Sequence, residues 1–441
     1  MSRFELLPAE LQIEIFTYLQ SSDIKAARAV SRKLRDNATP GLFRSIIACA
    51  RYPAMGAFQK ISLHSVYTNY IKEIIFDASI YEASLAQQER TYEHIQDKFE
   101  ELRFGSYWAK RSRWKRYQAL YQEQEDMKVS GVLLQTISRA LEWMPNITSI
   151  VYSPHPHLIP VEAKDMRDLI PRSASSSSLF PSSHITNGYA SSDHAFRHLI
   201  AAIYRSKYAG ISELRVEAYQ KGQPGTEFSL CMFDFPVADD FLAGKYLFQP
   251  LTSLQLNMVL SISGSCSAKQ QLADLAKLLA AAKGLRHLAF HITHWKCSPS
   301  LMYGNIFADG RPIFPHLGLR TTWPKLQSLS LEGIYADEKD LKGLLERHRD
   351  TLRTLIIRKC TLCAGNWAEV VDEVIFHSLI VSVFILDCVN ELDLHGADWM
   401  TFDTEEKTSW RYEGHLVDSQ DGERNFIEPN PDKKSVYELR R

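Results

Sequence analysis

The sequence predicts a mixed α/β protein in which a short helical segment precedes an irregular array of strand–helix repeats. An apolar pattern typical of short buried strands, φ-x-x-φ-x-φ (φ, apolar; x, any residue), recurs eight times between residues 71 and 386. Amphipathic helical stretches separate several of the copies, for example residues 271–285 and 337–352. The first 45 residues instead contain three short helical patterns.

The first helical pattern carries one apolar stripe. Pro8 stands where the first turn of a helix tolerates proline, because its missing N–H would be unpaired there. Apolar residues then recur every four positions, at Leu7, Leu11, Ile15 and Leu19. Ile24 and Val30 supply the apolar side of a second helix. Ser31 is expected to cap a third helix, which carries Leu34 and is expected to stop before Thr39-Pro40.

Three helices of this length bury little apolar surface. Below about 40 residues, a chain usually needs a metal, a disulfide or a partner to be stable. Residues 1–45 contain no cysteine, and Cys49 is the nearest thiol. The segment is therefore expected to pack against something else.

The repeated pattern predicts the remainder of the fold. Its eight copies are Ile71-Ile74-Phe76, Ile147-Ile150-Tyr152, Ile211-Leu214-Val216, Leu251-Leu254-Leu256, Leu285-Leu288-Phe290, Leu326-Leu329-Leu331, Leu352-Leu355-Ile357 and Val381-Phe384-Leu386. A single strand–helix unit cannot bury its apolar side, but stacked units can. The expected result is a curved parallel sheet on a concave face, with helices outside.

The clearest copy, residues 352–362, fits the longer pattern L-x-x-L-x-L-x-x-C-x-L of leucine-rich repeats. The copies that start at residues 326, 352 and 381 follow one another at roughly the 20–29-residue period of that class. Earlier gaps are longer. A generic α/β domain with unrelated strands is the alternative.

Composition excludes several classes of protein. The 441 residues exceed the roughly 250–300 that one core accommodates, so several domains or a repeat array are expected. A formal net charge of −1 gives no global attraction to nucleic acid or to an anionic membrane. The longest nearly apolar run, 374–386, is too short to span a bilayer.

The redox state and location follow from the cysteines and the N-terminus. The seven cysteines, an odd number, do not suggest a disulfide framework. The first ten residues lack the apolar core of a secretion signal. We therefore expect a reduced protein of the cytoplasm, the nucleus or both, without a membrane partner.

Three stretches differ from the repeats. Residues 84–128 are charged and helical in pattern, residues 173–192 form a Ser-rich low-complexity loop, and residues 415–441 form a polar tail. The expected organisation is a helical domain at 1–46 and a repeat domain at 47–414 that contains the helical insertion and the loop.

Residues 4–46 closely resemble the F-box motif. The matching features are Leu7-Pro8, Glu10-Leu11, Ile15, Leu19, Asp23-Ile24, Arg28, Val30-Ser31-Arg32, Leu34-Arg35 and Leu42-Phe43. Leu34 and Phe43 stand where tryptophan is common in the family, and Ile24 replaces leucine. The downstream repeats resemble those of leucine-rich F-box proteins with irregular, fungal-type spacing.

The resemblance implies a function. F-box proteins dock onto a Skp-type adaptor that hangs from a cullin–RING scaffold, and their remaining domain holds a substrate of this SCF-type ubiquitin ligase. The chain would then be a non-catalytic subunit without cofactor or metal, and its protein substrate is not legible in the sequence. The residues expected to dock the adaptor are Leu7, Pro8, Leu11, Ile15, Leu19, Ile24, Val30 and Leu34. The alternative is that these residues fold back on the repeats.

Two possible metal sites are weak. The single Cys360-x-x-Cys363 pair lacks the second pair that structural zinc requires, so Cys360 is expected in the core. On a strand, successive members of the set His291, His294 and Cys297 face opposite sides. The common nucleotide and hydrolase fingerprints GxGxxG, GxxxxGK[ST] and GxSxG are absent from the sequence.

One basic and aromatic stretch leaves other functions open. Residues 108–117 alternate lysine and arginine with tryptophan and tyrosine, a pattern that can clamp nucleic acid. A solvated helix face is the simpler interpretation, so nucleic acid is an unlikely partner, and an acidic patch on a protein is the favoured ligand if the stretch binds anything. An F-box scaffold that does not take part in ubiquitin transfer is a further alternative.

Overall fold

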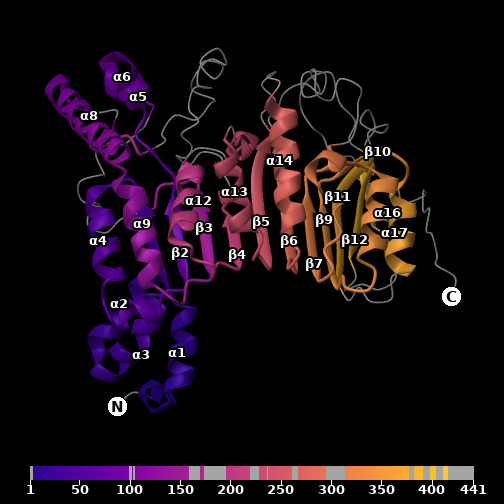
Figure 1. Ribbon diagram of the computed structural model, residues 1–441, viewed down its shortest axis with the longest axis horizontal. Helices are drawn as coiled ribbons and strands as arrows, with labels where there is room; N and C mark the ends of the chain where they lie inside the picture. The colour runs from indigo at the N-terminus through magenta and orange to yellow at the C-terminus, as the bar shows by residue number, and fades with distance from the viewer. Residues whose placement is uncertain are drawn as a thin grey trace. The chain divides into compact units, whose positions relative to one another are not determined.

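The computed structural model describes residues 3–98, 102, 105–157, 169–172, 195–218, 228–235, 237–260, 267–294, 313–376, 382–390, 398–403 and 411–415. The chain divides into two compact units, residues 1–226 and 227–441 (Figure 1). Within the described part of the chain, no helix combines the length and the apolar character needed to cross a membrane. The predicted Ser-rich loop and nearly all of the predicted polar tail lie outside the described residues.

The first unit begins with helices only, and then alternates strands with helices. Its elements in chain order are η1 Arg3–Leu6, α1 Ala9–Thr17, α2 Ser21–Val30, α3 Arg32–Leu42, β1 Ser45–Cys49, α4 Tyr52–Ser62, η2 Tyr67–Asn69, β2 Glu73–Asp77, α5 Ala83–Gln87, α6 Glu89–Gln96, α8 Tyr107–Ser130, α9 Val132–Trp143, β3 Ser149–Ser153, α12 Ala195–Ser206 and β4 Glu213–Val216.

The strands β1, β2, β3 and β4 pair in this order, and all the pairs are parallel. The apolar positions of the repeated pattern fall into register. Ile74 of β2 pairs with Ile46 of β1 on one side and with Ile150 of β3 on the other, and Ile150 pairs with Leu214 of β4. These aligned side chains form a continuous buried row, as the repeat hypothesis predicts.

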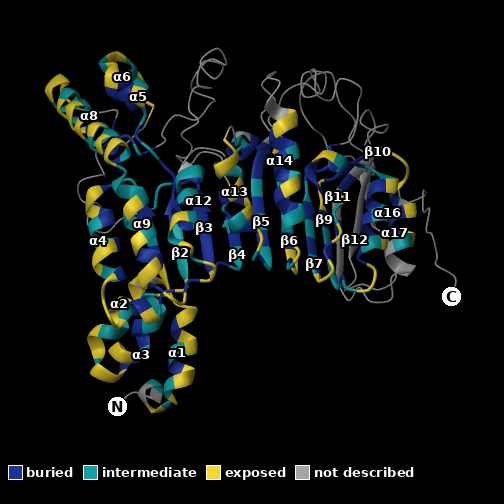
Figure 2. Cartoon of the chain, viewed as in Figure 1, coloured by how far each residue is buried: buried dark blue, intermediate teal, exposed yellow. Residues whose placement is uncertain are grey.

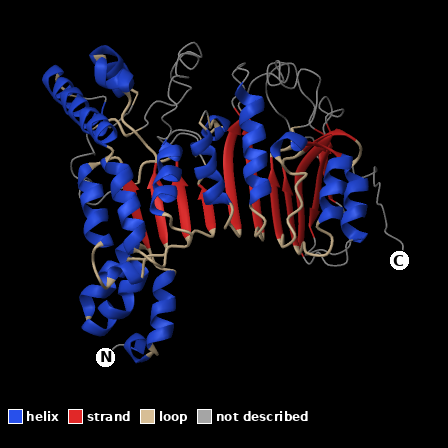
Figure 3. Ribbon diagram, in the orientation of Figure 1, coloured by secondary structure: helices blue, strands red, loops and turns tan. Residues whose placement is uncertain are grey.

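The second unit continues the same alternation. Its elements are η4 Leu230–Phe233, α13 Ala238–Phe248, β5 Ser253–Leu260, α14 Ser267–Ala281, β6 His287–His294, η5 Phe314–Leu317, β7 Ser328–Glu332, β8 Tyr335–Asp337, α16 Glu338–Arg347, β9 Thr354–Arg358, β10 Thr361–Ala364, α17 Trp367–Phe376, β11 Ser382–Asn390, β12 Asp398–Asp403 and β13 Arg411–His415. Figure 3 shows α13, α14, α16 and α17 beside the strands of this unit.

Strands β5, β6, β7, β9 and β11 of the second unit form a parallel ladder in that order. Leu254, Leu288, Leu329 and Leu355 pair in turn from β5 to β9. In the first seven copies, no residue at a φ position of the pattern is more than 2 % exposed. The mixed α/β class with a parallel sheet is thus confirmed.

The eighth copy was predicted in the wrong register. Val383 pairs with Leu355, and Ile385 pairs with Ile357, so the positions of β11 that align with the buried row of β9 are one residue away from Phe384 and Leu386, the positions predicted. The run from 379 to 386 is almost wholly apolar, so it fits the pattern in both registers. A one-residue slip exchanges the two faces of a strand, and only pairing with β9 decides between them.

Two successive repeats of the second unit share a local geometry. After β7 and β9, the chain turns through one residue with positive φ, Gly333 (69°) or Lys359 (49°), and enters a second short strand, β8 or β10. Strands β8 and β10 pair in parallel. The turn and the short strand recur together, so these two repeats share one structural pattern.

The charged stretch of the first unit has a small core of its own. Helices α5, α6 and α8 occupy the region predicted as a helical insertion. Tyr81, Leu85, Tyr92, Ile95 and Tyr117 are buried together there. Burial raises the pKa of the Tyr92 phenol to about 12, so this ring is a neutral core residue.

The N-terminal helices differ from prediction at one end. Ser31 caps α3 as expected, because its hydroxyl accepts a hydrogen bond from the Leu34 N–H at 3.3 Å. The helix does not stop before Pro40 but continues to Leu42. Pro40 has no N–H to donate to the Asp36 carbonyl, but the Phe43 N–H still closes the last turn on the Thr39 carbonyl. Thr39, the residue before the proline, also donates a hydrogen bond from its hydroxyl to the Arg35 carbonyl at 2.7 Å.

Candidate functional site

Helix α1 is anchored by a polar residue on its inner side. Gln12 is fully buried, and its Nε2 donates hydrogen bonds to the carbonyls of Phe4 and Leu7, both at 2.9 Å. Its Oε1 accepts a hydrogen bond from Asn37 Nδ2 on α3 at 2.8 Å. Phe16, one turn later on the same side, is also buried. These contacts fix which side of α1 faces its own bundle.

Much of the predicted apolar stripe is therefore left uncovered by the bundle. Leu11 is 46 % exposed and Ile15 is 38 % exposed, although apolar stripes normally face the core of their own domain. Leu19, just beyond the end of α1, is 39 % exposed. Val30, at the end of α2, is 70 % exposed. Figure 2 shows exposed residues along both α1 and α2. We call Leu11, Ile15 and Leu19 the exposed apolar face; Val30 is exposed on another helix.

The other predicted docking residues divide into two kinds. Pro8 is exposed and Leu7 is half-buried, next to the exposed apolar face in sequence. Ile24 and Leu34 instead lie in the core of the bundle with Phe16, and each is at most 5 % exposed. Both side chains are thus part of the core of the bundle.

The helical bundle joins the sheet without a linker. Helix α3 ends at Leu42 and β1 begins at Ser45. At this junction the Phe43 ring stacks on Tyr67 at 3.9 Å between ring centroids, and Tyr67 stacks on His64 at 3.8 Å. The Arg28 guanidinium of α2 lies 5.7 Å from the Phe43 centroid. Stacked rings and a cation–π contact thus fix the bundle to the first repeats.

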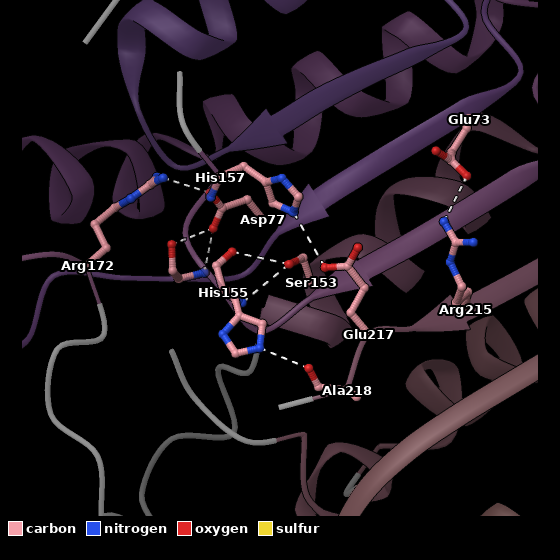
Figure 4. Close-up of polar contacts among 10 residues, drawn as sticks. Glu73, Asp77, Ser153, His155, His157, Arg172, Arg215, Glu217 and Ala218 are labelled. Atoms are coloured by element: carbon pink, nitrogen blue, oxygen red, sulfur yellow. Dashed lines mark hydrogen bonds and ion pairs between the residues drawn. The ribbon is translucent and has the colours of Figure 1, made fainter. Parts of the chain in front are cut away.

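A second candidate site lies where strands β2, β3 and β4 end (Figure 4). Asp77, the last residue of β2, is the centre of this cluster. One carboxylate oxygen accepts hydrogen bonds from the backbone N–H and the hydroxyl of Ser79. The other accepts bonds from the His157 N–H at 2.8 Å and from Arg172 Nη2 at 2.7 Å. The Asp77 side chain is 0 % exposed and that of Arg172 is 2 % exposed.

The same cluster contains a second ion pair. His157 Nε2 lies 3.5 Å from Glu217 Oε2 (Figure 4). Interaction with the Glu217 carboxylate raises the pKa of His157, and interaction with the His157 ring lowers the pKa of Glu217. Nearby, His155 Nε2 lies 2.9 Å from the Ala218 carbonyl oxygen. Each of these pairs joins segments that are distant in sequence.

The geometry favours a structural role for this cluster. Its acceptors are occupied by donors of the chain itself, so no carboxylate oxygen of Asp77 is left for a ligand. Within the described ranges, no group of three or more His, Cys, Asp or Glu side chains is placed to hold a metal ion. The cluster ties the segments that follow the strands to the end of the sheet.

Sequence reasoning missed this cluster, although part of the signal was present. Asp77, Ser153 and Glu217 each directly follow the last apolar position of a repeat copy. The ends of neighbouring parallel strands meet at one edge of a sheet, so these three residues are neighbours. Arg172 follows no repeat copy, and only the folded structure places it beside Asp77.

The two weak metal motifs have other roles. Cys360 is 2 % exposed, and its Sγ lies 3.3 Å from the Arg358 carbonyl oxygen, which fits the predicted core position. His291 lies on β6 between two neighbours of the ladder, with Nδ1 2.8 Å from Asn257 Oδ1 and Nε2 3.1 Å from Ser330 Oγ. Cys297 lies outside the described residues.

Several cations of the basic stretch contact the chain itself. Lys110 Nζ lies 2.6 Å from Asp97 Oδ1, and Arg111 Nε lies 3.7 Å from Glu89 Oε1. Arg113 Nη1 donates a hydrogen bond to the Leu102 carbonyl at 3.1 Å. These three side chains hold α6 and the segment after it against α8. They are therefore less available to a polyanion than the sequence suggests.

Comparison with known proteins identifies the N-terminal region. Residues 4–48 match the F-box-like family. None of the curated proteins matches the chain. The match covers α1, α2 and α3 and most of β1, which includes the whole exposed apolar face. The chain thus carries an F-box-like domain, a module that in general binds a Skp-type adaptor.

Proposed function

We propose that this protein is the substrate-recognition subunit of an SCF-type ubiquitin ligase in the cytoplasm or nucleus. Its F-box-like domain docks onto a Skp-type adaptor, and its repeats hold a protein substrate. The observation that carries the proposal is the outward orientation of the apolar stripe of α1. A stripe that faces solvent inside an F-box-like domain is suited to a partner chain, since burial of apolar surface drives association.

The proposed docking residues are the exposed apolar face together with Leu7, Pro8 and Val30. Ile24 and Leu34 act indirectly, because they hold α2 and α3 in place under that surface. The buried Gln12 fixes the rotation of α1, so that Leu11 and Ile15 point outward before any partner arrives. Such preorganisation lowers the entropy that docking would otherwise cost.

We further propose that the repeats form a leucine-rich-repeat solenoid in each unit. The in-register apolar rows and the shared turn after β7 and β9 support this assignment. Alternate residues of the strands lie on the opposite side of the sheet from these rows, among them Gln255, His291, Ser330 and Thr354. In a solenoid these positions belong to the binding surface, and their polar character suits a protein partner.

The chain would act by tethering and would supply no reacting group. A substrate held near a charged conjugating enzyme meets it at raised effective concentration. The stacked rings of Phe43, Tyr67 and His64 support this role, because they fix the bundle relative to the first repeats. The position of a bound substrate relative to the adaptor is then defined.

The proposal is tested by co-purification of the full chain with its adaptor. Leu7→Ala combined with Pro8→Ala is expected to abolish adaptor capture while the repeats stay folded. The matched control is Val129→Ala on α8, which changes an exposed apolar side chain far along the sequence from the F-box-like domain. Retained capture by the double variant contradicts the docking model. Adaptor capture without any cullin favours a scaffold outside the ligase.

A further inference from the structure

Two large aromatic side chains are exposed at the start of α8. Trp108 is 73 % exposed and Tyr107 is 54 % exposed, and their rings pack edge to face with centroids 5.5 Å apart. Rings of this size are usually covered, at least in part, by their own chain. The start of α8 lies beyond the ends of the strands of the first unit (Figure 1). It is therefore accessible to another molecule.

The rest of α8 is held firmly. Trp114 Nε1 donates a hydrogen bond to the Leu85 carbonyl at 3.1 Å, and the Tyr117 hydroxyl accepts one from the Glu82 N–H at 2.9 Å. Further along, Gln124 exchanges two hydrogen bonds with the Tyr81 backbone. Glu123 pairs with the buried Arg51 at 2.7 Å. Because four side chains already fix this helix, binding at its exposed side costs little additional conformational entropy of the helix.

The exposed side of α8 is basic next to the aromatic pair. Lys115 lies two turns after Trp108 on the same side of the helix and is exposed. Among the residues that the structure describes between 83 and 119, which include α5, α6 and the first half of α8, seven are lysine or arginine and three are acidic. A ligand at this surface is therefore expected to be negatively charged.

We infer that Tyr107, Trp108 and Lys115 form a docking surface for an acidic protein segment that also carries an apolar side chain. We call these three residues the α8 tip. Tryptophan and tyrosine are the side chains that most often dominate protein interfaces, and a neighbouring cation steers an acidic partner toward them. The identification of this segment as part of a ubiquitination substrate rests on the proposed function.

The cations favour a protein over nucleic acid as the ligand. Nucleic-acid binding draws its affinity from many phosphate contacts. In the basic stretch, Lys110, Arg111 and Arg113 are already engaged with α6 and with the Leu102 carbonyl. An acidic segment with one apolar side chain needs only one or two cations and an aromatic ring on which that side chain can pack. The α8 tip supplies both kinds of contact.

The inference is tested with the full chain and a fluorescent peptide of glutamate and aspartate that contains leucine and phenylalanine. Binding is followed by fluorescence anisotropy at near-physiological salt. Trp108→Ala is expected to weaken binding by about tenfold or more, the loss typical of a central interface aromatic. Lys115→Glu is expected to weaken it and to reduce its salt dependence. The matched control, Trp143→Ala, removes another exposed tryptophan of the same unit and is expected to have no effect.

Each other outcome has a defined meaning. No binding of the peptide, or equal binding by Trp108→Ala and the unchanged chain, overturns the inference. Tighter binding of an oligothymidylate, lost in Trp108→Ala, replaces the acidic protein with nucleic acid. Adaptor capture is measured on the same variants. A chain that binds the peptide but captures no adaptor refutes the proposed function and leaves the docking surface in place.

Discussion

Truncation of the exposed apolar face gives a quantitative test of docking. We consider Leu11→Ala combined with Ile15→Ala, because these two residues lie one turn apart on the outer side of α1. Full burial of a leucine or isoleucine side chain contributes about 1.5–3 kcal/mol relative to full exposure. Since Leu11 is 46 % and Ile15 is 38 % exposed, a partner that covers both gains roughly 1.3–2.5 kcal/mol from them.

This free energy corresponds to a loss of affinity of about 10- to 60-fold for the double variant. Purified adaptor is titrated against the full chain, and the dissociation constant is measured by isothermal titration calorimetry or surface plasmon resonance. Far-ultraviolet circular dichroism checks that the helices persist, which is expected because Gln12 and Phe16 still anchor α1. A loss of less than about threefold, with the helices intact, would refute the assignment of this face to the adaptor.

Three further predictions concern the structure that supports the sites. Phe16→Ala removes the largest side chain of the bundle core and is expected to cost about 3–5 kcal/mol; hydrogen exchange in α1, α2 and α3 should rise, and unchanged protection contradicts this. Asp77→Asn leaves the buried Arg172 without its ionic partner, so about 3–5 kcal/mol of stability is expected to be lost in urea unfolding. Addition of Arg172→Met should restore part of it, and an unchanged midpoint in the single variant argues against the ion pair. The His157–Glu217 pair should stabilise the fold most between about pH 4.5 and 6.5. Folding raises the pKa of His157, so the stabilisation from its charged form is lost as the pH rises through this raised pKa. Folding lowers the pKa of Glu217, so the stabilisation from its carboxylate is lost only when the pH falls through this lowered pKa. His157→Gln should therefore cost up to about 1 kcal/mol in that window and less above it, and a pH-independent difference contradicts the assignment.

Much of the architecture could be predicted from local patterns. The three N-terminal helices, the Ser31 cap and the strand positions of seven repeat copies follow from residue types at fixed spacing. Such features depend on a few neighbouring residues. Apolar side chains repeat about every 3.6 residues along a helix and every 2 along a strand, and both periods can be read from the sequence. The F-box-like domain belongs to the same class, because its motif is a contiguous segment of residues 4–48.

Pairing between distant segments could not be predicted in this way. The register of β11 needed its neighbour β9, since the apolar run fits either face. The basic stretch gave no sign that Lys110 would pair with Asp97, just after α6, or that Arg111 would pair with Glu89, at the start of α6. The bond between Asp77 and Arg172 joins positions that share no motif.

The residue pattern alone predicts that the chain begins with an amphipathic bundle and continues as strand–helix repeats. Packing of the folded bundle places Gln12 and Phe16 on the inner side of α1 and leaves Leu11 and Ile15 partly exposed. A helical period shows that an apolar stripe exists, but it does not show what will cover the stripe. That choice depends on which neighbours satisfy the buried polar groups, here Phe4, Leu7 and Asn37 around Gln12.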